Sequence, residues 1–281
     1  MRNDLIVLMG ERRYAVDCPW GTLPDGQSFG PLSQIAVDSS GRVYVFQRSN
    51  PPVLVFSPEG VLIDTFGEGI FSDAHGIFVT RDDLILLVDR DAHEIIACES
   101  SGAVRFRLGQ RHQPQFNQPF NHPTDIAQAP NGDFYISDGY GNSNVHCFGA
   151  DGVFRFSWGR QGSGPGEFTP PHAVWVDPSE RVLVADRENN RVQLFDLKGT
   201  FIEAWDDFYH PMDIFGDAQG NIFVTDQIPR LSMMSSEGRL IGRCRPVRFG
   251  AHGIGGDADG NLYLAETAPL DCVTRLRLLD H

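Results

Sequence analysis

Short apolar runs recur along the chain, and their starts are separated by 40 to 49 residues. In the copy HAVWVD (172–177), apolar residues precede an acidic one, and a polar turn leads to the second apolar run, VLVAD (182–186). The six copies start at Ser33, His75, Thr124, His172, Met212 and His252. The residues fourteen positions later are mostly acidic: Gln47, Asp89, Asp138, Asp186, Asp226 and Glu266. Each copy therefore predicts two paired strands joined by a tight turn.

Further alternating runs, such as GVFRFSWG (152–159), predict a fourth strand in most copies. A repeat of this length with several short strands is typical of a β-propeller blade. No helical periodicity of useful length is present. We predict an all-β, six-bladed β-propeller that forms a single domain over residues 1–281.

The sixth copy ends near Leu279 without a fourth-strand run. A missing outer strand would leave a sheet edge open to pairing with other chains. We therefore expect part of residues 5–17, around RYAV (13–16), to join the last blade as its outer strand and so close the ring.

The composition indicates which binding partners and which cellular compartment to expect. The chain has 37 acidic and 23 basic residues and a formal charge of −14, which disfavours binding to nucleic acid. Its five cysteines are spread widely without a CxxC pair, as expected of buried or half-buried free thiols in a reducing compartment. The longest N-terminal apolar run, Leu5–Met9, is too short for a signal peptide or a membrane span. We expect a cytoplasmic monomer without a membrane partner.

Histidine occupies the repeat start in alternate copies, at His75, His172 and His252. The innermost strand of a blade begins near the central channel, so three imidazoles would face one axis. Three histidines with an open fourth position are typical of a catalytic zinc site. The alternative is that these are packing histidines that share a register.

Two copies carry a reactive side chain just after the second strand: Arg48 in the first and Tyr140 in the third. Positive charge near a tyrosine favours the phenolate, which could act as a general base. An arginine at that rim could bind a carboxylate with two hydrogen bonds. In DRENNRVQ (186–193), by contrast, the polar residues are expected to hold the turn together, with Asp186 paired to Arg191.

The motifs DGYGNS (138–143), PPHAVWVD (170–177) and VADRENNRVQLF (184–195) resemble those of NHL-repeat propellers. More narrowly, nearly the whole chain resembles peptidyl-α-hydroxyglycine α-amidating lyase and its bacterial relatives. This resemblance implies zinc held by His75, His172 and His252, with Tyr140 as the base and Arg48 beside it.

The sequence departs from that family at three glycines. Gly250 stands where the lyase has Met, Gly253 where it has an aspartate that binds a structural calcium, and Gly141 where it has a cysteine. Calcium is therefore a doubtful second cofactor, although Asp125 and Asp213 could supply oxygen ligands. Three residues ahead of strand starts either line the channel mouth and bind substrate or are ordinary loop residues: Asp73, His122 and His210.

By this resemblance we expect a zinc-dependent lyase that cleaves the carbon–nitrogen bond of an N-acyl α-hydroxyglycine-like carbinolamine, giving an amide and a glyoxylate-type aldehyde. The expected substrate is a small or short peptide-like molecule with a carboxylate, which Arg48 would orient. Two alternatives stay open: a metal-dependent, lactonase-like hydrolase, and a non-catalytic propeller that binds protein partners.

Overall fold

The structure is a computed structural model that describes residues 5–279, and within that range it contains strands and connections but no helix. The expectation of an all-β chain is confirmed. None of the described residues forms a helix able to cross a membrane. The chain forms two compact units, one of residues up to Gly69 and from Phe215 onward, the other of Ile70–Ile214.

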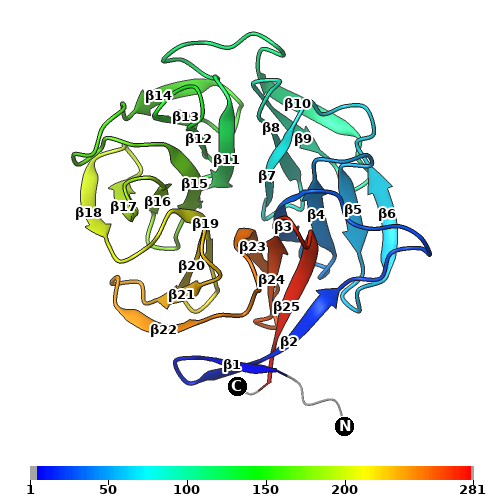
Figure 1. Ribbon diagram of the computed structural model, residues 1–281. Coiled ribbons are helices and arrows are strands. Elements are labelled where there is room, and N and C mark those ends of the chain that lie inside the picture. Colours follow the sequence, from blue (N-terminus) through cyan, green and yellow to red (C-terminus); the bar gives the residue numbers. More distant parts are fainter. Residues whose placement is uncertain (1–4, 280–281) are drawn as a thin grey trace. The chain divides into compact units, whose positions relative to one another are not determined.

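The unit of Ile70–Ile214 holds three antiparallel sheets, each with four strands in chain order (Figure 1). The first contains β7 (Ala74–Val79), β8 (Ile85–Asp89), β9 (Glu94–Cys98) and β10 (Val104–Gly109). The second contains β11 (Pro123–Gln128), β12 (Phe134–Asp138), β13 (Asn144–Phe148) and β14 (Phe154–Trp158). The third contains β15 (Pro171–Val176), β16 (Arg181–Asp186), β17 (Arg191–Asp196) and β18 (Phe201–Trp205).

The other unit contains the first sheet of the chain and the last. The first sheet has β3 (Leu32–Val37), β4 (Val43–Gln47), β5 (Val53–Phe56) and β6 (Leu62–Phe66). The last has five strands in the order β1 (Ile6–Met9), β2 (Arg12–Trp20), β25 (Cys272–Leu278), β24 (Leu262–Glu266) and β23 (Ala251–Gly256). The remaining sheet has β19 (Pro211–Gly216), β20 (Ile222–Asp226), β21 (Leu231–Met234) and β22 (Leu240–Cys244), and the boundary between the two units falls within β19.

Burial differs between the strands of one sheet in the way the sequence pattern predicts. In the sheet of β11–β14, all five residues of β12 and of β13 are buried, whereas β14 is mostly exposed or half-buried. Strands covered on both faces read as continuous apolar runs, and a strand with one solvated face alternates. The core side of this sheet therefore consists of β11, β12 and β13, and β14 is its outer strand.

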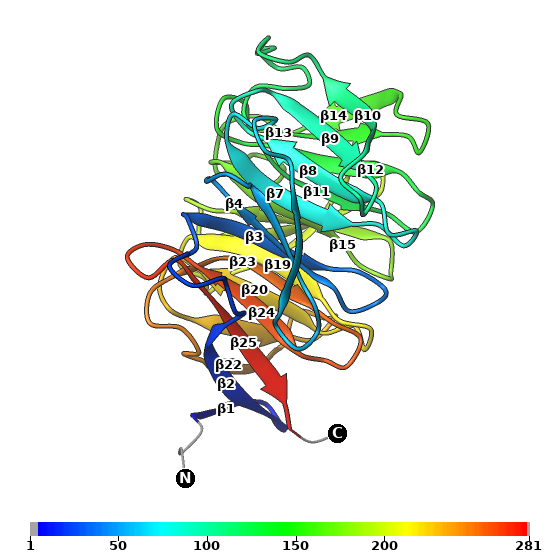
Figure 2. The same cartoon turned by 90° about the vertical axis from the view of Figure 1, so that its right-hand side faces the viewer.

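The N-terminal segment supplies a strand to the last sheet. β2 pairs antiparallel with β25, with Tyr14 opposite Leu278 and Val16 opposite Leu276 (Figure 2). This is where the sequence places RYAV. β1 adds a fifth strand beside β2, which the sequence pattern does not predict.

The repeat start coincides with an irregularity in strand pairing. The register shifts between Pro171 and Ala173, so His172 is an extra residue in its strand, and the same shift occurs around His252. A β-bulge redirects a side chain and leaves its backbone groups outside the ladder. The bulge therefore places His172 and His252 outside the regular pairing of their strands.

Tyr14→Ala is expected to lower the free energy of unfolding by about 3 kcal/mol, because Tyr14 is fully buried in β2 and a large-to-small change leaves a cavity. Chemical denaturation measures this change. Leu8→Ala in β1 is the matched control, since Leu8 is 59% exposed. Equal midpoints for Tyr14→Ala and the unsubstituted protein would show that β2 adds little to the fold.

Candidate functional site

Two of the predicted metal ligands, His75 and His172, lie together in the unit of Ile70–Ile214. They are the second residues of β7 and β15, and each is 2% exposed. Nδ1 of His75 lies 2.6 Å from the carbonyl oxygen of Thr124, and Nδ1 of His172 lies 2.6 Å from that of Met212. A carbonyl only accepts hydrogen bonds, so each Nδ1 carries the proton. In the neutral ring, Nε2 then presents a lone pair, which is the form that binds a metal ion.

The third predicted ligand, His252, makes the same backbone contact in the other unit. Its Nδ1 lies 2.9 Å from the carbonyl oxygen of Ser33, the residue at the equivalent repeat position in the first sheet. His252 is 9% exposed. All three histidines thus donate from Nδ1 to the repeat-start carbonyl of a neighbouring sheet, which fixes one tautomer in every copy.

The hydroxyl of Tyr140 lies against both ring nitrogens of the pair. Its oxygen is 3.0 Å from Nε2 of His172 and 3.4 Å from Nε2 of His75. The two imidazole rings are 5.2 Å apart between centroids, and their ligand atoms lie within 4.8 Å of one another. A metal ion bound by this pair would therefore lie next to the phenol oxygen.

Two guanidinium groups face Tyr140. Arg187 donates from Nη1 to the phenol oxygen at 3.1 Å, and the guanidinium carbons of Arg187 and Arg90 lie 5.4 and 5.2 Å from the ring centroid. Burial alone would lower the pKa of Arg90, but its hydrogen bond to Asp91 and the charge of Asp73 raise it. Arg90 thus stays charged beside the ring.

The sequence interpretation missed both arginines because they lie in turns that read as structural. The signal was the Asp-Arg pair that ends the second strand, at Asp89-Arg90 and Asp186-Arg187. The expected pairing of Asp186 with Arg191 is confirmed at 2.8 Å. The residue directly after the aspartate is therefore the one that reaches the tyrosine.

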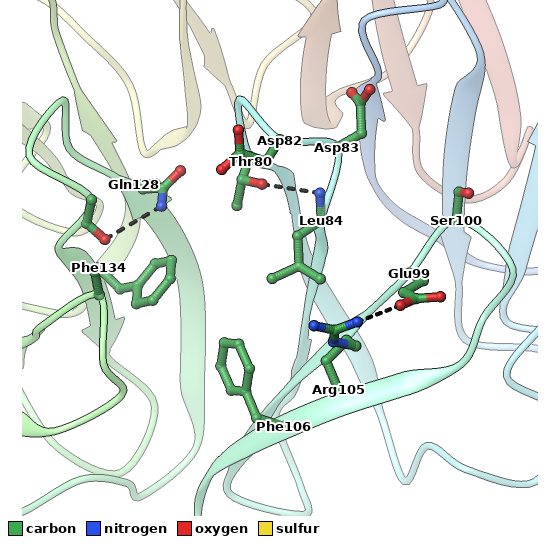
Figure 3. A pocket seen from close by; sticks show the side chains of 12 residues that line it. Thr80, Asp82, Asp83, Leu84, Glu99, Ser100, Arg105, Phe106, Gln128 and Phe134 are labelled. Carbon is green, nitrogen blue, oxygen red and sulfur yellow. Dashed lines mark hydrogen bonds and ion pairs between the residues drawn. The ribbon is translucent and has the colours of Figure 1, made fainter.

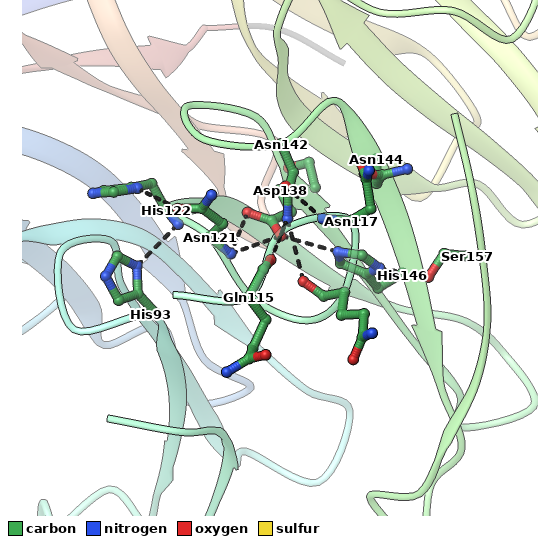
Figure 4. Close-up of polar contacts among 12 residues, drawn as sticks. His93, Gln115, Asn117, Asn121, His122, Asp138, Asn142, Asn144, His146 and Ser157 are labelled. Carbon is green, nitrogen blue, oxygen red and sulfur yellow. Dashed lines mark hydrogen bonds and ion pairs between the residues drawn. The ribbon is translucent and has the colours of Figure 1, made fainter. Parts of the chain in front are cut away.

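The loop that carries Tyr140 is held by a buried aspartate (Figure 4). Asp138 accepts hydrogen bonds from the backbone N–H of Asn121, from Nδ2 of Asn142 at 2.8 Å and from Nε2 of His146 at 3.0 Å. Next to it, a Cβ on Gly139 would lie only 2.2 Å from the carbonyl oxygen of Pro171. The Asp-Gly-Tyr sequence therefore combines an anchor, a close approach to β15 and the reactive side chain.

The other predicted site residues lie as follows. Asp73 forms an ion pair with Arg90 at 3.2 Å and so acts on the tyrosine through that arginine. His122 packs edge-on against His93, with the ring centroids 4.4 Å apart. The pKa of His93 is lowered, mainly by its burial and in addition by the charge of His122. His210 stacks on Tyr209 and lies 3.2 Å from Glu188. Their roles in substrate binding stay predictions.

Arg48 follows β4 in the other unit and is exposed. Its backbone N–H donates to the carbonyl of Pro31 at 2.9 Å, which fixes the backbone of the turn. Its assignment to the carboxylate of a substrate stays a prediction.

The residues considered for calcium take part in backbone contacts. Oδ2 of Asp125 accepts the N–H of Val174 at 3.0 Å, and Oδ1 of Asp213 accepts the N–H of Ile214 at 2.8 Å. At Gly253, a Cβ would lie 2.5 Å from the Cα of Gln34. The backbone packing therefore leaves no room for the aspartate that the lyase has there.

A cleft of about 700 Å³ in the same unit lies away from these residues (Figure 3). It includes Thr80 and Leu84, beyond the opposite end of β7 from His75, together with Phe106 and Phe134. Its wall is stabilised by an ion pair of Arg105 with Glu99 at 2.6 Å. None of the predicted site residues lines it.

The comparisons with known proteins agree with the fold and include proteins named as amidating lyases. A family model described as a 6-bladed beta-propeller matches residues 122–228. The peptidylglycine alpha-amidating monooxygenase of Rattus norvegicus is 28% identical over 84% of this chain and 29% of its own length. A probable peptidyl-alpha-hydroxyglycine alpha-amidating lyase of Caenorhabditis elegans is 29% identical over 62% of this chain and 58% of its own.

NHL repeat-containing protein 3 of Homo sapiens is 29% identical over 79% of this chain and 70% of its own length. Among solved structures, a gluconolactonase of Xanthomonas campestris superposes with a TM-score of 0.73 at 13% identity, over 96% of this chain and 91% of its own. At that identity the likeness concerns the fold alone.

The protein is thus a six-bladed β-propeller, as the repeat predicts. Its homologues include proteins named as peptidyl-α-hydroxyglycine amidating lyases and as NHL-repeat proteins. The chain spans less than a third of the length of the amidating monooxygenases that it matches.

Gly76→Ala is expected to lower the free energy of unfolding by about 1–3 kcal/mol, because a Cβ there would lie 2.8 Å from the backbone oxygen of Thr124. That oxygen also accepts the hydrogen bond of His75, so the change should weaken the orientation of the imidazole. Denaturant unfolding gives the stability. In the control Gly164→Ala, the new Cβ meets only the flexible side chain of Glu167, and the cost should be smaller. Equal effects of the two substitutions would contradict a special requirement for glycine after His75.

Proposed function

We propose that the protein is a zinc-dependent carbon–nitrogen lyase that acts on an N-acyl α-hydroxyglycine-like carbinolamine. The observation that carries the proposal is the position of the Tyr140 hydroxyl, 3.0 and 3.4 Å from two imidazole nitrogens and 3.1 Å from a guanidinium. The lyase homologues support the same reaction class.

His75, His172 and His252 would hold the metal ion. The donor set fits zinc, since each imidazole is fixed by its Nδ1 proton and presents a neutral Nε2. A bound zinc ion would supply a Lewis acid that polarises the oxygen of the substrate hydroxyl.

Tyr140, as the phenolate, would remove the proton of the substrate hydroxyl. The oxygen electron pair then forms the carbonyl of the aldehyde while the carbon–nitrogen bond breaks, and the leaving amide nitrogen takes up the same proton from Tyr140, which returns to the phenolate. The products are a primary amide and a glyoxylate-type aldehyde, so protons and electrons balance without an oxidant. Arg187 and Arg90 place positive charge next to Tyr140: Nη1 of Arg187 donates to the phenol oxygen at 3.1 Å, and both guanidinium groups face the ring.

The carboxylate of the substrate would be bound by Arg48, an exposed arginine that follows β4. His122, His210 and Asp73 are proposed to shape the pocket around it. We propose a small metabolite with the carbinolamine core as the substrate of a cytoplasmic monomer. Such a protein would have no nucleic-acid or membrane partner, in keeping with its charge of −14.

Tyr140→Phe is expected to reduce turnover of an N-acyl α-hydroxyglycine, such as the N-benzoyl compound, by about 10²–10⁴-fold, because a general base is removed. Glyoxylate and benzamide release are measured together with bound zinc, which should be unchanged. Tyr135→Phe is the control: its hydroxyl, in the same sheet, donates to the carbonyl of Leu197 and also contacts the thiol of Cys147, away from the histidines. Full activity of Tyr140→Phe would refute the assigned base, and lactone opening without glyoxylate release would favour a hydrolase.

His172→Ala is expected to remove most of the zinc that His75, His172 and His252 hold, since a three-ligand site loses one ligand. Zinc is measured by elemental analysis after equilibration with a weak chelator. The matched control is His112→Asn, which changes an exposed loop histidine. If His172→Ala and the unsubstituted protein retained equal zinc, the metal assignment to these histidines would be wrong.

A further inference from the structure

Two thiols and a buried carboxylate lie together where β2, β24 and β25 meet. Sγ of Cys18 is 3.8 Å from Sγ of Cys272 and 3.7 Å from Oε1 of Glu266. Cys272 and Glu266 are direct partners across β24 and β25, and Cys18 lies in the register shift between β2 and β25. Glu266 is fully buried and Cys272 is 9% exposed, whereas Cys18 is exposed, contrary to the expectation of buried or half-buried thiols.

Glu266 occupies the repeat position that ends the second strand, and it differs there from the four equivalent aspartates. Each of those aspartates has a basic side chain within 4 Å: Arg111 at Asp89, His146 at Asp138, Arg191 at Asp186 and Arg230 at Asp226. Among the residues that the structure describes, no arginine, lysine or histidine forms such a pair with Glu266. A buried carboxylate without a compensating cation is costly, so this position calls for a positive charge.

The distances match those that a tetrahedral zinc ion imposes on its ligands. With zinc–sulfur bonds of about 2.3 Å and zinc–oxygen bonds of about 2.0–2.2 Å, two sulfurs lie about 3.8 Å apart and sulfur and oxygen about 3.5–3.7 Å apart. The observed separations are 3.8 and 3.7 Å. Thr274 donates to Oε1 of Glu266 at 2.5 Å, and the N–H of Arg248 donates to Oε2 at 3.1 Å. These hydrogen bonds orient the carboxylate, as hydrogen bonds from neighbouring groups orient metal ligands.

We propose that Cys18, Cys272 and Glu266 form a second metal site, one for a thiophilic divalent ion such as zinc. Thiolate ligands select zinc over calcium or magnesium. Three protein ligands leave the fourth position to water on the side of the exposed Cys18. The bound ion would neutralise Glu266 in the way that arginine side chains neutralise Asp89, Asp186 and Asp226. It would also link β2 to β24 and β25, which lie more than 240 residues away in sequence. A link that closes so long a loop stabilises the folded chain.

A disulfide between the two cysteines is the competing product, and it would leave Glu266 without a cation. The site is independent of the proposed lyase, since its ligands all lie in one unit and include no histidine.

The test uses the reduced, metal-free protein titrated with cobalt(II), since thiolate ligands give a charge-transfer absorption in the near ultraviolet that imidazole ligands do not. We expect this absorption in the unsubstituted protein and in His172→Ala, and its loss or a marked weakening in Cys18→Ser. Glu266→Gln should bind the ion at least tenfold more weakly in a chelator competition. In the His172→Ala background, zinc should raise the unfolding temperature, and Cys18→Ser should remove that rise.

The control is Cys244→Ser, because Cys244 lies outside this cluster and burial raises the pKa of its thiol to about 12. Its absorption should equal that of the unsubstituted protein. No charge-transfer band, a band unchanged in Cys18→Ser, or a Cys18–Cys272 disulfide that forms in place of metal binding would each overturn the proposal. Since His172→Ala tests the histidine site separately, failure of one metal site does not count against the other.

Discussion

The candidate site depends on one hydrogen bond, repeated three times, from a histidine Nδ1 to the repeat-start carbonyl of a neighbouring sheet. Register shifts at the repeat starts of β3, β7, β11, β15 and β23 take backbone groups out of the ladder, which allows this bond. The bond selects one tautomer and fixes the ring plane. An imidazole that would be mobile on a loop is thereby presented with its Nε2 lone pair in a constant direction.

The tyrosine is held by different means. Asp138 gathers the loop through its bonds to Asn121, Asn142 and His146, and Gly139 lets that loop approach β15 closely. The result is a phenol oxygen that contacts two imidazoles and a guanidinium at once. Rigid sheets thus bring together groups from the ends of β7, β12 and β15, and a guanidinium from the turn after β16, that are far apart in sequence.

The architecture could be predicted from the sequence because a period of 40 to 49 residues repeats the same strand pattern six times. Tyr140 and the His75–His172 pair were also predicted, since their positions follow from the repeat register. Arg187 was missed because Asp-Arg turns recur for structural reasons, and only the folded structure shows which arginine reaches the phenol. The bulges were missed as well, since a one-residue register shift leaves no mark in an apolar pattern. The Cys18 cluster depends on pairing across 254 residues, which no local pattern contains.

The most direct test is anomalous X-ray scattering at the zinc absorption edge from crystals of the full chain grown with zinc. A peak about 2.0–2.1 Å from Nε2 of His75, His172 and His252, beside the phenol oxygen of Tyr140, is the predicted result. A map with no peak at these nitrogens, or with the three imidazoles too far apart to share one ion, would contradict the proposed metal centre and the lyase chemistry built on it.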